Sequence, residues 1–87
     1  MTENATEAAV RQFLLSEVLY DRELKELAPD HSLIDRGLLD SLGILKTVTY
    51  CEEHFGIRIP DQEVLPDNFE NVRAIARLVE RCRTAGR

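Results

Sequence analysis

Ser41 is the residue of this chain best placed to take part in chemistry. It lies in the segment "GLLDSLG", Gly37 to Gly43, where a long loop ends and a helical pattern begins. A phosphate group on a serine at the amino end of a helix would meet unpaired backbone N–H groups and the positive end of the helix dipole. The apolar Leu42 beside it would offer a contact to a protein that modifies the serine. The segment therefore predicts a phosphodiester attachment point.

The other candidate nucleophiles, bases and metal ligands do not form a catalytic set with Ser41. His54 lies thirteen residues further along the same expected helix, about 20 Å away at 1.5 Å per residue, so it cannot serve as the general base. His31 lies in the preceding loop, and we interpret it as a surface residue. Cys51 and Cys82 fall on apolar helix faces, where free cysteine commonly packs as a small core residue. We predict no catalytic residue and no metal site.

Composition is typical of a small helical domain. The chain has 87 residues, of which 44% are hydrophobic and 6% aromatic, with no tryptophan. This composition suits short helices packed through Leu, Val and Ile better than a β-sandwich. The formal net charge of -5 disfavours nucleic acid and anionic membranes as partners, because both require basic patches. The chain has no signal-peptide pattern and no apolar run near the ~20 residues of a membrane span, so we expect a cytoplasmic protein. Its length suits a single domain, 1–87, and we expect a monomer.

Hydrophobic periodicity and turn residues predict an all-α fold with three main helices and one short helix. Pro29 ends the first helix and opens a loop rich in Asp, Ser and Gly. Asp40 is the expected N-cap of the second helix, and Gly56 is placed to end that helix in a left-handed conformation. Asn71 is a good N-cap for the last helix. The expected helices cover approximately 6–27, 41–55, 61–65 and 71–83.

The central helix is predicted to have one face toward the core and the opposite face toward solvent. At about 100° per residue, four apolar side chains fall within about 60° of one another and should face the core. They are Ile44, Val48, Cys51 and Phe55. The opposite side carries Leu42, Lys46, Thr49 and Glu53, with Tyr50 at its edge. The leucine beside the serine is therefore expected to point to solvent.

These residues resemble a known family, the phosphopantetheine-bearing carrier proteins, which include acyl carrier proteins and peptidyl and aminoacyl carriers. The attachment motif of that family, Asp-Ser followed by Leu, Met or Ile, corresponds to Asp40, Ser41 and Leu42. The segment "LIDRGLLDSLGILKTVTYCEEHFGIRIPDQEV" is similar to the family's loop, second helix and short third helix, and "NFENVRAIARLV" is similar to its final helix. The resemblance implies the family's bundle of three long helices and one short one.

The resemblance also implies a function. Ser41 would receive a 4'-phosphopantetheine arm from a phosphopantetheinyl transferase, and Asp40 and Leu42 would help that enzyme engage the site. The thiol of the arm would hold a biosynthetic intermediate as a thioester, and the protein itself would catalyse no reaction. Its other partners would be a loading adenylation enzyme, ligase or acyltransferase, and a downstream acyltransferase or condensing enzyme.

Departures from the family pattern bear on the pathway. Carriers of fatty-acid synthesis usually have glycine two residues before the aspartate and an acidic second helix. Here Gly37 lies three residues before Asp40, and Gly43 and Lys46 occupy positions where acidic residues are common. This favours a dedicated partner over a fatty-acid synthase. The residues expected to contact that partner are Leu42, Lys46, Thr49 and Tyr50.

The leading hypothesis is a stand-alone carrier of a polyketide, nonribosomal-peptide or hybrid pathway, as in antibiotic biosynthesis. A D-alanyl carrier for envelope modification is the nearest alternative. In a different class of protein, an unmodified helical interaction module whose acidic surface binds a basic partner, Ser41 would only cap the helix. A small hydrolase is a third hypothesis, which lacks an oxyanion loop and a substrate cleft.

Overall fold

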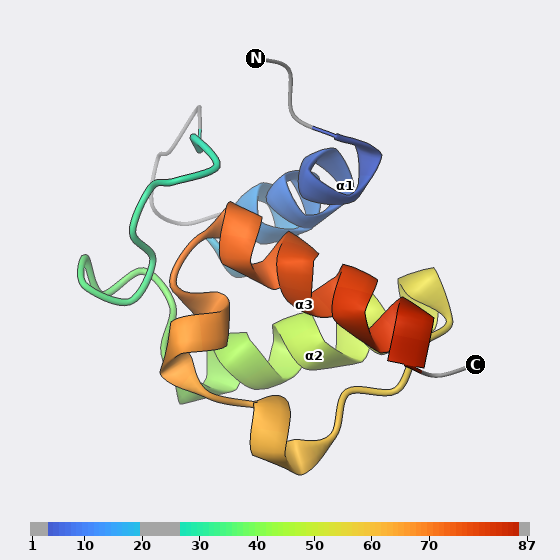
Figure 1. The fold of residues 1–87 in the computed structure, drawn as a ribbon. Coiled ribbons are helices and arrows are strands. Elements are labelled where there is room, and N and C mark those ends of the chain that lie inside the picture. The colour runs from blue at the N-terminus through green and yellow to red at the C-terminus, as the bar shows by residue number, and fades with distance from the viewer. Residues whose placement is uncertain (1–3, 20–26, 86–87) are drawn as a thin grey trace.

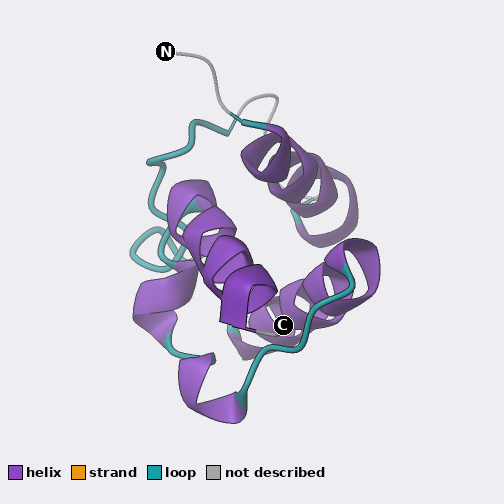
Figure 2. Ribbon diagram, turned by 45° about the vertical axis from the view of Figure 1, so that its right-hand side comes forward, coloured by secondary structure: helices purple, strands orange, loops and turns teal. Residues whose placement is uncertain are grey.

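The computed structural model describes residues 4–19 and 27–85, and the regular secondary structure of this part of the chain is all helical, with no strand. Helix α1 spans Ala5–Phe13 and continues into a π-helical turn, η1, Leu14–Val18. Helix α2 spans Ser41–Phe55 and helix α3 spans Val72–Ala85. Two 3-10 turns, η2 at Asp61–Glu63 and η3 at Pro66–Phe69, connect α2 to α3. Figures 1 and 2 show the resulting helical bundle, which confirms the all-α fold class.

Helix α2 begins and ends at the residues that the sequence pattern indicates. Asp40 is its N-cap, and Gly56 follows its last residue in a left-handed conformation with φ 65° and ψ 40°. Asn71 precedes α3, and its side-chain oxygen accepts a hydrogen bond from the N–H of Ala74 at 2.8 Å. Both ends of α2 thus follow from local chemistry, a polar cap at the start and a glycine after the end.

The first helix differs from the expected range 6–27. Its described helical part ends at Val18, Leu19 lies in a bend, and Leu27 is outside any helix. The remainder of the expected range, 20–26, lies outside the described residues. The N–H of Leu19 donates to the carbonyl oxygen of Leu14 at 2.7 Å, which widens the last turn. Such i→i+5 turns interrupt the regular α-helical ladder, so periodicity alone overestimated the length of this helix.

The expected short helix 61–65 is replaced by the two 3-10 turns η2 and η3. Leu65, between them, is extended, with φ −120° and ψ 147°. The residue before a proline is disfavoured in the helical region because the proline ring clashes with its backbone, and Pro66 follows directly. The proline therefore separates the two turns.

The core lies between the three helices, and α3 contributes the most buried face. In Figure 1, α3 crosses the middle of the molecule, with α1 above it and α2 below it. Burial of each large aliphatic side chain contributes roughly 1.5–3 kcal/mol to folding. The apolar core comprises Val10, Leu14, Leu19, Leu27, Leu33, Leu39, Cys51, Ile59, Phe69, Val72, Ile75, Leu78, Val79 and Cys82.

The buried line of α2 differs in part from the predicted one. Cys51 is fully buried as expected, but the side chains of Ile44, Val48 and Phe55 are only partly buried against the core. The fully enclosed positions one and two turns before Cys51 are Thr47 and Gly43. A Cβ on Gly43 would lie 2.8 Å from Leu39 Cδ1 of the preceding loop and 3.4 Å from Val18 Cγ1 of η1, so this position of α2 has no room for a larger side chain. Hydrophobicity alone does not reveal this line.

The loop before α2 is tied to the start of α3, and this connection positions the attachment segment. The N–H of Leu33 donates to the carbonyl oxygen of Glu70 at 2.7 Å, and the N–H of Arg73 donates to that of Pro29 at 2.9 Å. The Leu33 side chain is fully buried, and the hydroxyl of Ser32 donates to the carboxylate of Glu70. The chain therefore enters α2 from an anchored loop. None of the described helices is long and apolar enough to cross a membrane.

Candidate functional site around Ser41

Asp40, and not Ser41, caps helix α2. The backbone of Asp40 is extended, and its Oδ1 accepts a hydrogen bond from the N–H of Gly43 at 2.8 Å. Ser41 is the first residue of α2 and is exposed. Within the described ranges 4–19 and 27–85, its hydroxyl makes no hydrogen bond. The hydroxyl therefore has no structural task at the helix start and is open to solvent.

The start of α2 fits a phosphate group on Ser41. The first N–H groups of a helix have no intrahelical acceptor, and Asp40 satisfies only that of Gly43 through its side chain. The N–H groups of Ser41 and Leu42 remain directed toward the amino end of the helix, where the dipole favours negative charge. The Asp40 carboxylate adds a negative charge at the same place, so a phosphate on Ser41 would also be repelled by this neighbouring carboxylate.

The outward face of α2 is as the sequence predicts, with one addition. Leu42 is 62% exposed, and Lys46, Thr49 and Glu53 are exposed on the same side. Leu45 is also 58% exposed, and the sequence analysis did not single it out. The angular count would have found it, because Leu45 lies within about 60° of Leu42 around the helix axis. Two exposed leucines therefore follow Ser41 within its first helical turn.

Tyr50 lies at the edge of this face, where it packs α2 against α1. Its ring stacks on Phe13, with centroids 4.2 Å apart and ring planes 12° apart, and His54 stacks on Tyr50 at 4.9 Å. The Tyr50 hydroxyl donates to the carbonyl oxygen of Ala9 at 3.3 Å. Burial raises the pKa of Tyr50, so the phenol stays protonated and can keep this bond at neutral pH. His54 thus lies at the end of α2 remote from Ser41.

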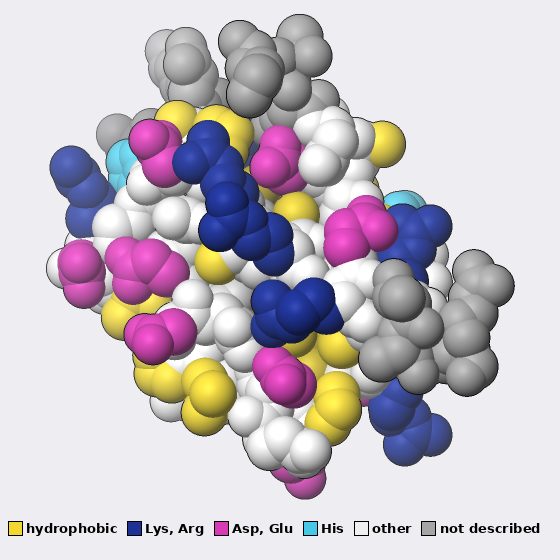
Figure 3. Space-filling view, in the orientation of Figure 1, with side chains coloured by type: hydrophobic (Ala, Val, Ile, Leu, Met, Phe, Trp, Pro, Cys, Tyr) yellow, Lys and Arg dark blue, Asp and Glu magenta, His cyan; other side chains and the backbone are white. Residues whose placement is uncertain are grey.

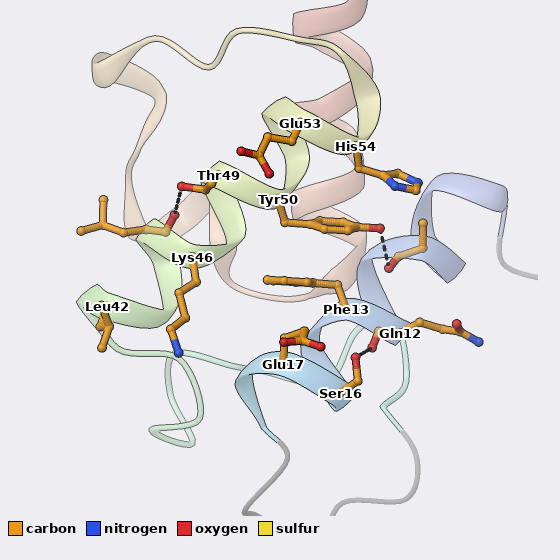
Figure 4. A pocket seen from close by; sticks show the side chains of 12 residues that line it. Gln12, Phe13, Ser16, Glu17, Leu42, Lys46, Thr49, Tyr50, Glu53 and His54 are labelled. Atoms are coloured by element: carbon orange, nitrogen blue, oxygen red, sulfur yellow. Dashed lines mark hydrogen bonds between the residues drawn. The ribbon is translucent and has the colours of Figure 1, made fainter.

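A groove of about 860 Å³ separates the outward face of α2 from α1 and η1. Figure 4 shows the rings of Tyr50 and Phe13 stacked between α2 and α1, with polar side chains of both helices around them. Leu42, Leu45, Lys46, Thr49 and Tyr50 line it from α2. The groove therefore contains all four of the residues predicted to contact partners.

The two cysteines are buried and unreactive, as predicted. Cys51 has no exposed surface. Burial, and next the neighbouring Cys82 and Glu52, raise the pKa of the Cys51 thiol to about 12. Burial likewise raises the pKa of Cys82. Because the thiolate is the nucleophile and the metal ligand, neither cysteine supplies a reactive sulfur at neutral pH. No group of three potential metal ligands occurs among the described residues.

The surface charge is unevenly distributed, which the net charge does not reveal. Figure 3 shows a band of Lys and Arg side chains across the face on which α3 lies. Arg73, Arg77 and Arg81 follow one another at single helical turns along α3 and line a shallow depression. Arg81 pairs with Glu63 at 3.2 Å. Acidic side chains lie on both sides of this band, and Glu7 and Glu80 line the same depression.

A comparison with known protein families agrees with an exposed serine at the start of α2. Residues 12–79 match the family model of the phosphopantetheine attachment site. The chain belongs to the phosphopantetheine-binding carrier proteins. It is therefore a non-catalytic carrier, whose family carries 4'-phosphopantetheine as a covalent cofactor. Carriers of this family work with phosphopantetheinyl transferases and with loading and acyl-transfer enzymes.

Two curated proteins illustrate what this carrier protein is similar to. It is 32% identical over 54 residues to aminoacyl carrier protein 2 of Bradyrhizobium diazoefficiens, a match that covers 62% of this chain and 60% of that protein. It is 34% identical over 62 residues to the D-alanyl carrier protein of Streptococcus pyogenes serotype M5, and this match covers 71% of this chain and 77% of that protein.

Proposed function

We propose that Ser41 is the attachment residue and that this protein carries an aminoacyl thioester. The observation that carries the proposal is the division of roles at the start of α2. Asp40 caps the helix, so the exposed Ser41 hydroxyl remains available to an enzyme. Both residues lie inside the matched range 12–79.

In the attachment step, Ser41 Oγ forms a bond to the phosphorus of the pantetheine-bearing phosphate of coenzyme A. The phosphoanhydride bond of coenzyme A breaks, adenosine 3',5'-bisphosphate leaves, and the serine proton passes to a base of the transferase. The N–H groups at the start of α2 and the helix dipole favour the resulting phosphodiester. When bound, the arm supplies a terminal thiol that holds the cargo as a thioester. Tethering on a short flexible arm keeps the cargo near docked enzymes at an effective concentration in the millimolar range.

The names of the relatives support an aminoacyl cargo more than a simple acyl one. One is called an aminoacyl carrier and the other a D-alanyl carrier. A loading adenylation enzyme or ligase would then supply the cargo, and a downstream acyltransferase or condensing enzyme would remove it. We infer that the pathway is of the polyketide or nonribosomal-peptide type, with D-alanyl transfer for envelope modification as the second candidate. We further expect a cytoplasmic monomer.

These partners are proposed to dock on the outward face of α2. Leu42 and Leu45 offer exposed apolar contacts beside Ser41, and Lys46 offers a positive charge one turn after Leu42. A carrier with acidic residues at this place would attract a basic enzyme surface, whereas Lys46 favours a partner with an acidic group opposite it. Thr49 and Tyr50 complete the proposed contact surface.

Intact-protein mass after incubation with coenzyme A and a broad-specificity phosphopantetheinyl transferase tests the attachment. The wild type should gain one phosphopantetheine, and Ser41→Ala should gain none. Ser16→Ala, which removes a different exposed serine, should gain the same mass as the wild type. A wild type that stays unmodified while circular dichroism shows intact helices would favour the unmodified interaction module instead.

A further inference from the structure

Three exposed arginines form a stripe along α3. Arg73, Arg77 and Arg81 follow one another at intervals of four residues, and they line a shallow depression of about 430 Å³ between α3 and the start of α1. Residues four apart lie on the same face of a helix, about 6 Å apart along its axis. The arginine stripe therefore extends over about 12 Å, on the face where Figure 3 shows the basic band.

Two of the three guanidinium groups have no partner in the part of the chain that the structure describes. Neither Arg73 nor Arg77 makes an ion pair or a side-chain hydrogen bond with any residue of 4–19 or 27–85. Arg81 differs, because its Nη2 lies 3.2 Å from Glu63 Oε1 and 3.4 Å from Asn68 Oδ1. The chain has 16 acidic residues against 11 Lys and Arg. Two adjacent unpaired arginines are therefore an uncompensated positive charge on an acidic protein.

The carboxylates of the same depression are held by other groups of the chain. Glu7 Oε1 accepts a hydrogen bond from the N–H of Asn4 at 3.1 Å, as part of the capping box of α1. Glu80 Oε2 accepts one from the hydroxyl of Thr6 at 2.7 Å and lies 3.4 Å from Arg83 Nη1. Both carboxylates thus help to fix α1 and α3, and they leave the guanidinium groups of the stripe to an external partner.

The surroundings of the stripe suit a short row of carboxylates better than a long polyanion. Nucleic acids and anionic membranes bind through many basic contacts, whereas acidic side chains lie on both sides of this band and the net charge is -5. A helix with carboxylates four residues apart has the same spacing of about 6 Å as the arginines. Carboxylates also match the planar, forked guanidinium group of arginine.

We propose that the arginine stripe docks an acidic helix of a partner protein, with one carboxylate opposite Arg73 and the next, four residues along, opposite Arg77. The proposal goes beyond the proposed function and requires no arm on Ser41. None of the stripe residues lines the groove beside α2, so this surface differs from the one proposed for the loading and transfer enzymes. A partner held here would raise the effective concentration of the carrier near that partner's own enzyme domain.

The test uses a synthetic acidic helix as the probe. It is an acetylated and amidated alanine-rich peptide with glutamate at every fourth position, and the control peptide has glutamine at those positions. Nuclear magnetic resonance follows the side-chain N–H groups of Arg73 and Arg77 in the full chain during titration. We expect saturable shifts with the glutamate peptide only. Because exposed ion pairs are individually weak, the affinity should be in the millimolar range and should fall severalfold between about 50 and about 500 mM NaCl.

Two charge reversals locate the binding surface. Arg77→Glu and Arg58→Glu both replace an exposed arginine and change the net charge equally, but Arg58 lies outside the depression. Arg77→Glu should weaken binding severalfold, whereas Arg58→Glu should change it by less than about twofold. A peptide with lysine in place of one glutamate should bind Arg77→Glu more tightly than it binds the wild type. Circular dichroism checks that both variants keep their helices.

Each outcome decides a different point. The absence of saturable shifts at Arg73 and Arg77, or equal losses in the two variants, would overturn docking on the stripe. A short DNA duplex or phosphatidylglycerol vesicles that bind as tightly as the peptide, with the same dependence on Arg77, would overturn the acidic helix as the partner. Ser41→Ala should bind the peptide as the wild type does. Failure of phosphopantetheine attachment and failure of docking are therefore distinguishable.

Discussion

Asp40 Oδ1 accepts a hydrogen bond from the N–H of Gly43 at 2.8 Å, and this bond leaves the intervening Ser41 without a capping role. Two polar residues at a helix start are commonly interchangeable as caps on sequence grounds. Here the extended backbone of Asp40 decides between them. The aspartate stabilises the helix, and the serine, one residue further, presents its hydroxyl to solvent.

The capping role predicts unequal costs for two neighbouring substitutions. Asp40→Ala should lower the free energy of unfolding by about 1 kcal/mol, because the Gly43 N–H loses its acceptor. Ser41→Ala, at an exposed position without a hydrogen bond in the described structure, should change it by less than about 0.5 kcal/mol. Urea unfolding followed by circular dichroism measures both. A larger loss in Ser41→Ala than in Asp40→Ala would contradict the assignment of the cap.

The left-handed conformation of Gly56, after the end of α2, predicts that a substitution there lowers stability through backbone strain and not through a steric clash. Gly56 has φ 65°, and a Cβ at this position would meet no atom within 4 Å. Gly56→Ala should therefore destabilise the protein by about 1 kcal/mol through strain alone. Thermal or urea unfolding measures the change. Gly56→Asn, which tolerates this conformation better, should recover part of the loss, and equal losses in both variants would argue against strain as the cause.

The raised pKa of Cys51 predicts a loss of stability at high pH. An unfolded thiol ionises near its ordinary pKa of 9.0, whereas the folded thiol stays protonated up to about 12. Between these values the folded state binds more protons, so the free energy of unfolding falls by up to about 1.4 kcal/mol per pH unit for this group. Below pH 9 the contribution is constant.

Urea unfolding between pH 8 and 11, in wild type and Cys51→Ala, measures this dependence. The variant should be less stable at neutral pH because it leaves a small cavity, but its stability should fall less steeply with pH. Tyr50 and Cys82, whose pKa values are raised as well, keep a residual slope in the variant. Identical slopes in the two proteins would show that Cys51 is not the group responsible.

The exposure of Leu42 predicts an effect on enzymes and not on folding. Leu42→Ala should leave the free energy of unfolding nearly unchanged, because the side chain is 62% exposed. It should raise the KM of the phosphopantetheinyl transferase severalfold by removing an apolar contact beside Ser41. Steady-state kinetics by intact mass measures this, with Leu65→Ala as the exposed-leucine control. An unchanged KM would remove Leu42 from the proposed docking surface.

Local sequence signals were sufficient for the parts of this protein in which local chemistry decides the structure. The polar cap, the helical period and the terminal glycine predict both ends of α2, and the same segment contains the family's attachment motif. The outward orientation of Leu42 follows from the helical angle alone. These features depend on residues within a few positions of one another, and no distant contact overrides them.

The tertiary structure decided the features that depend on packing between helices. The widened turn after Phe13 shortened the first helix that periodicity predicted. The division of the short helix at Leu65 is different, because it is the local effect of Pro66. Burial of Gly43 and Thr47 reflects how closely α2 approaches its neighbours, which is a distance between elements and not a property of either residue. The groove is lined by residues of both helices, and within it Phe13, from α1, stacks on Tyr50, 37 positions later in the chain. A sequence places residues on helix faces, but the space between two helices is set by the side chains that meet across it.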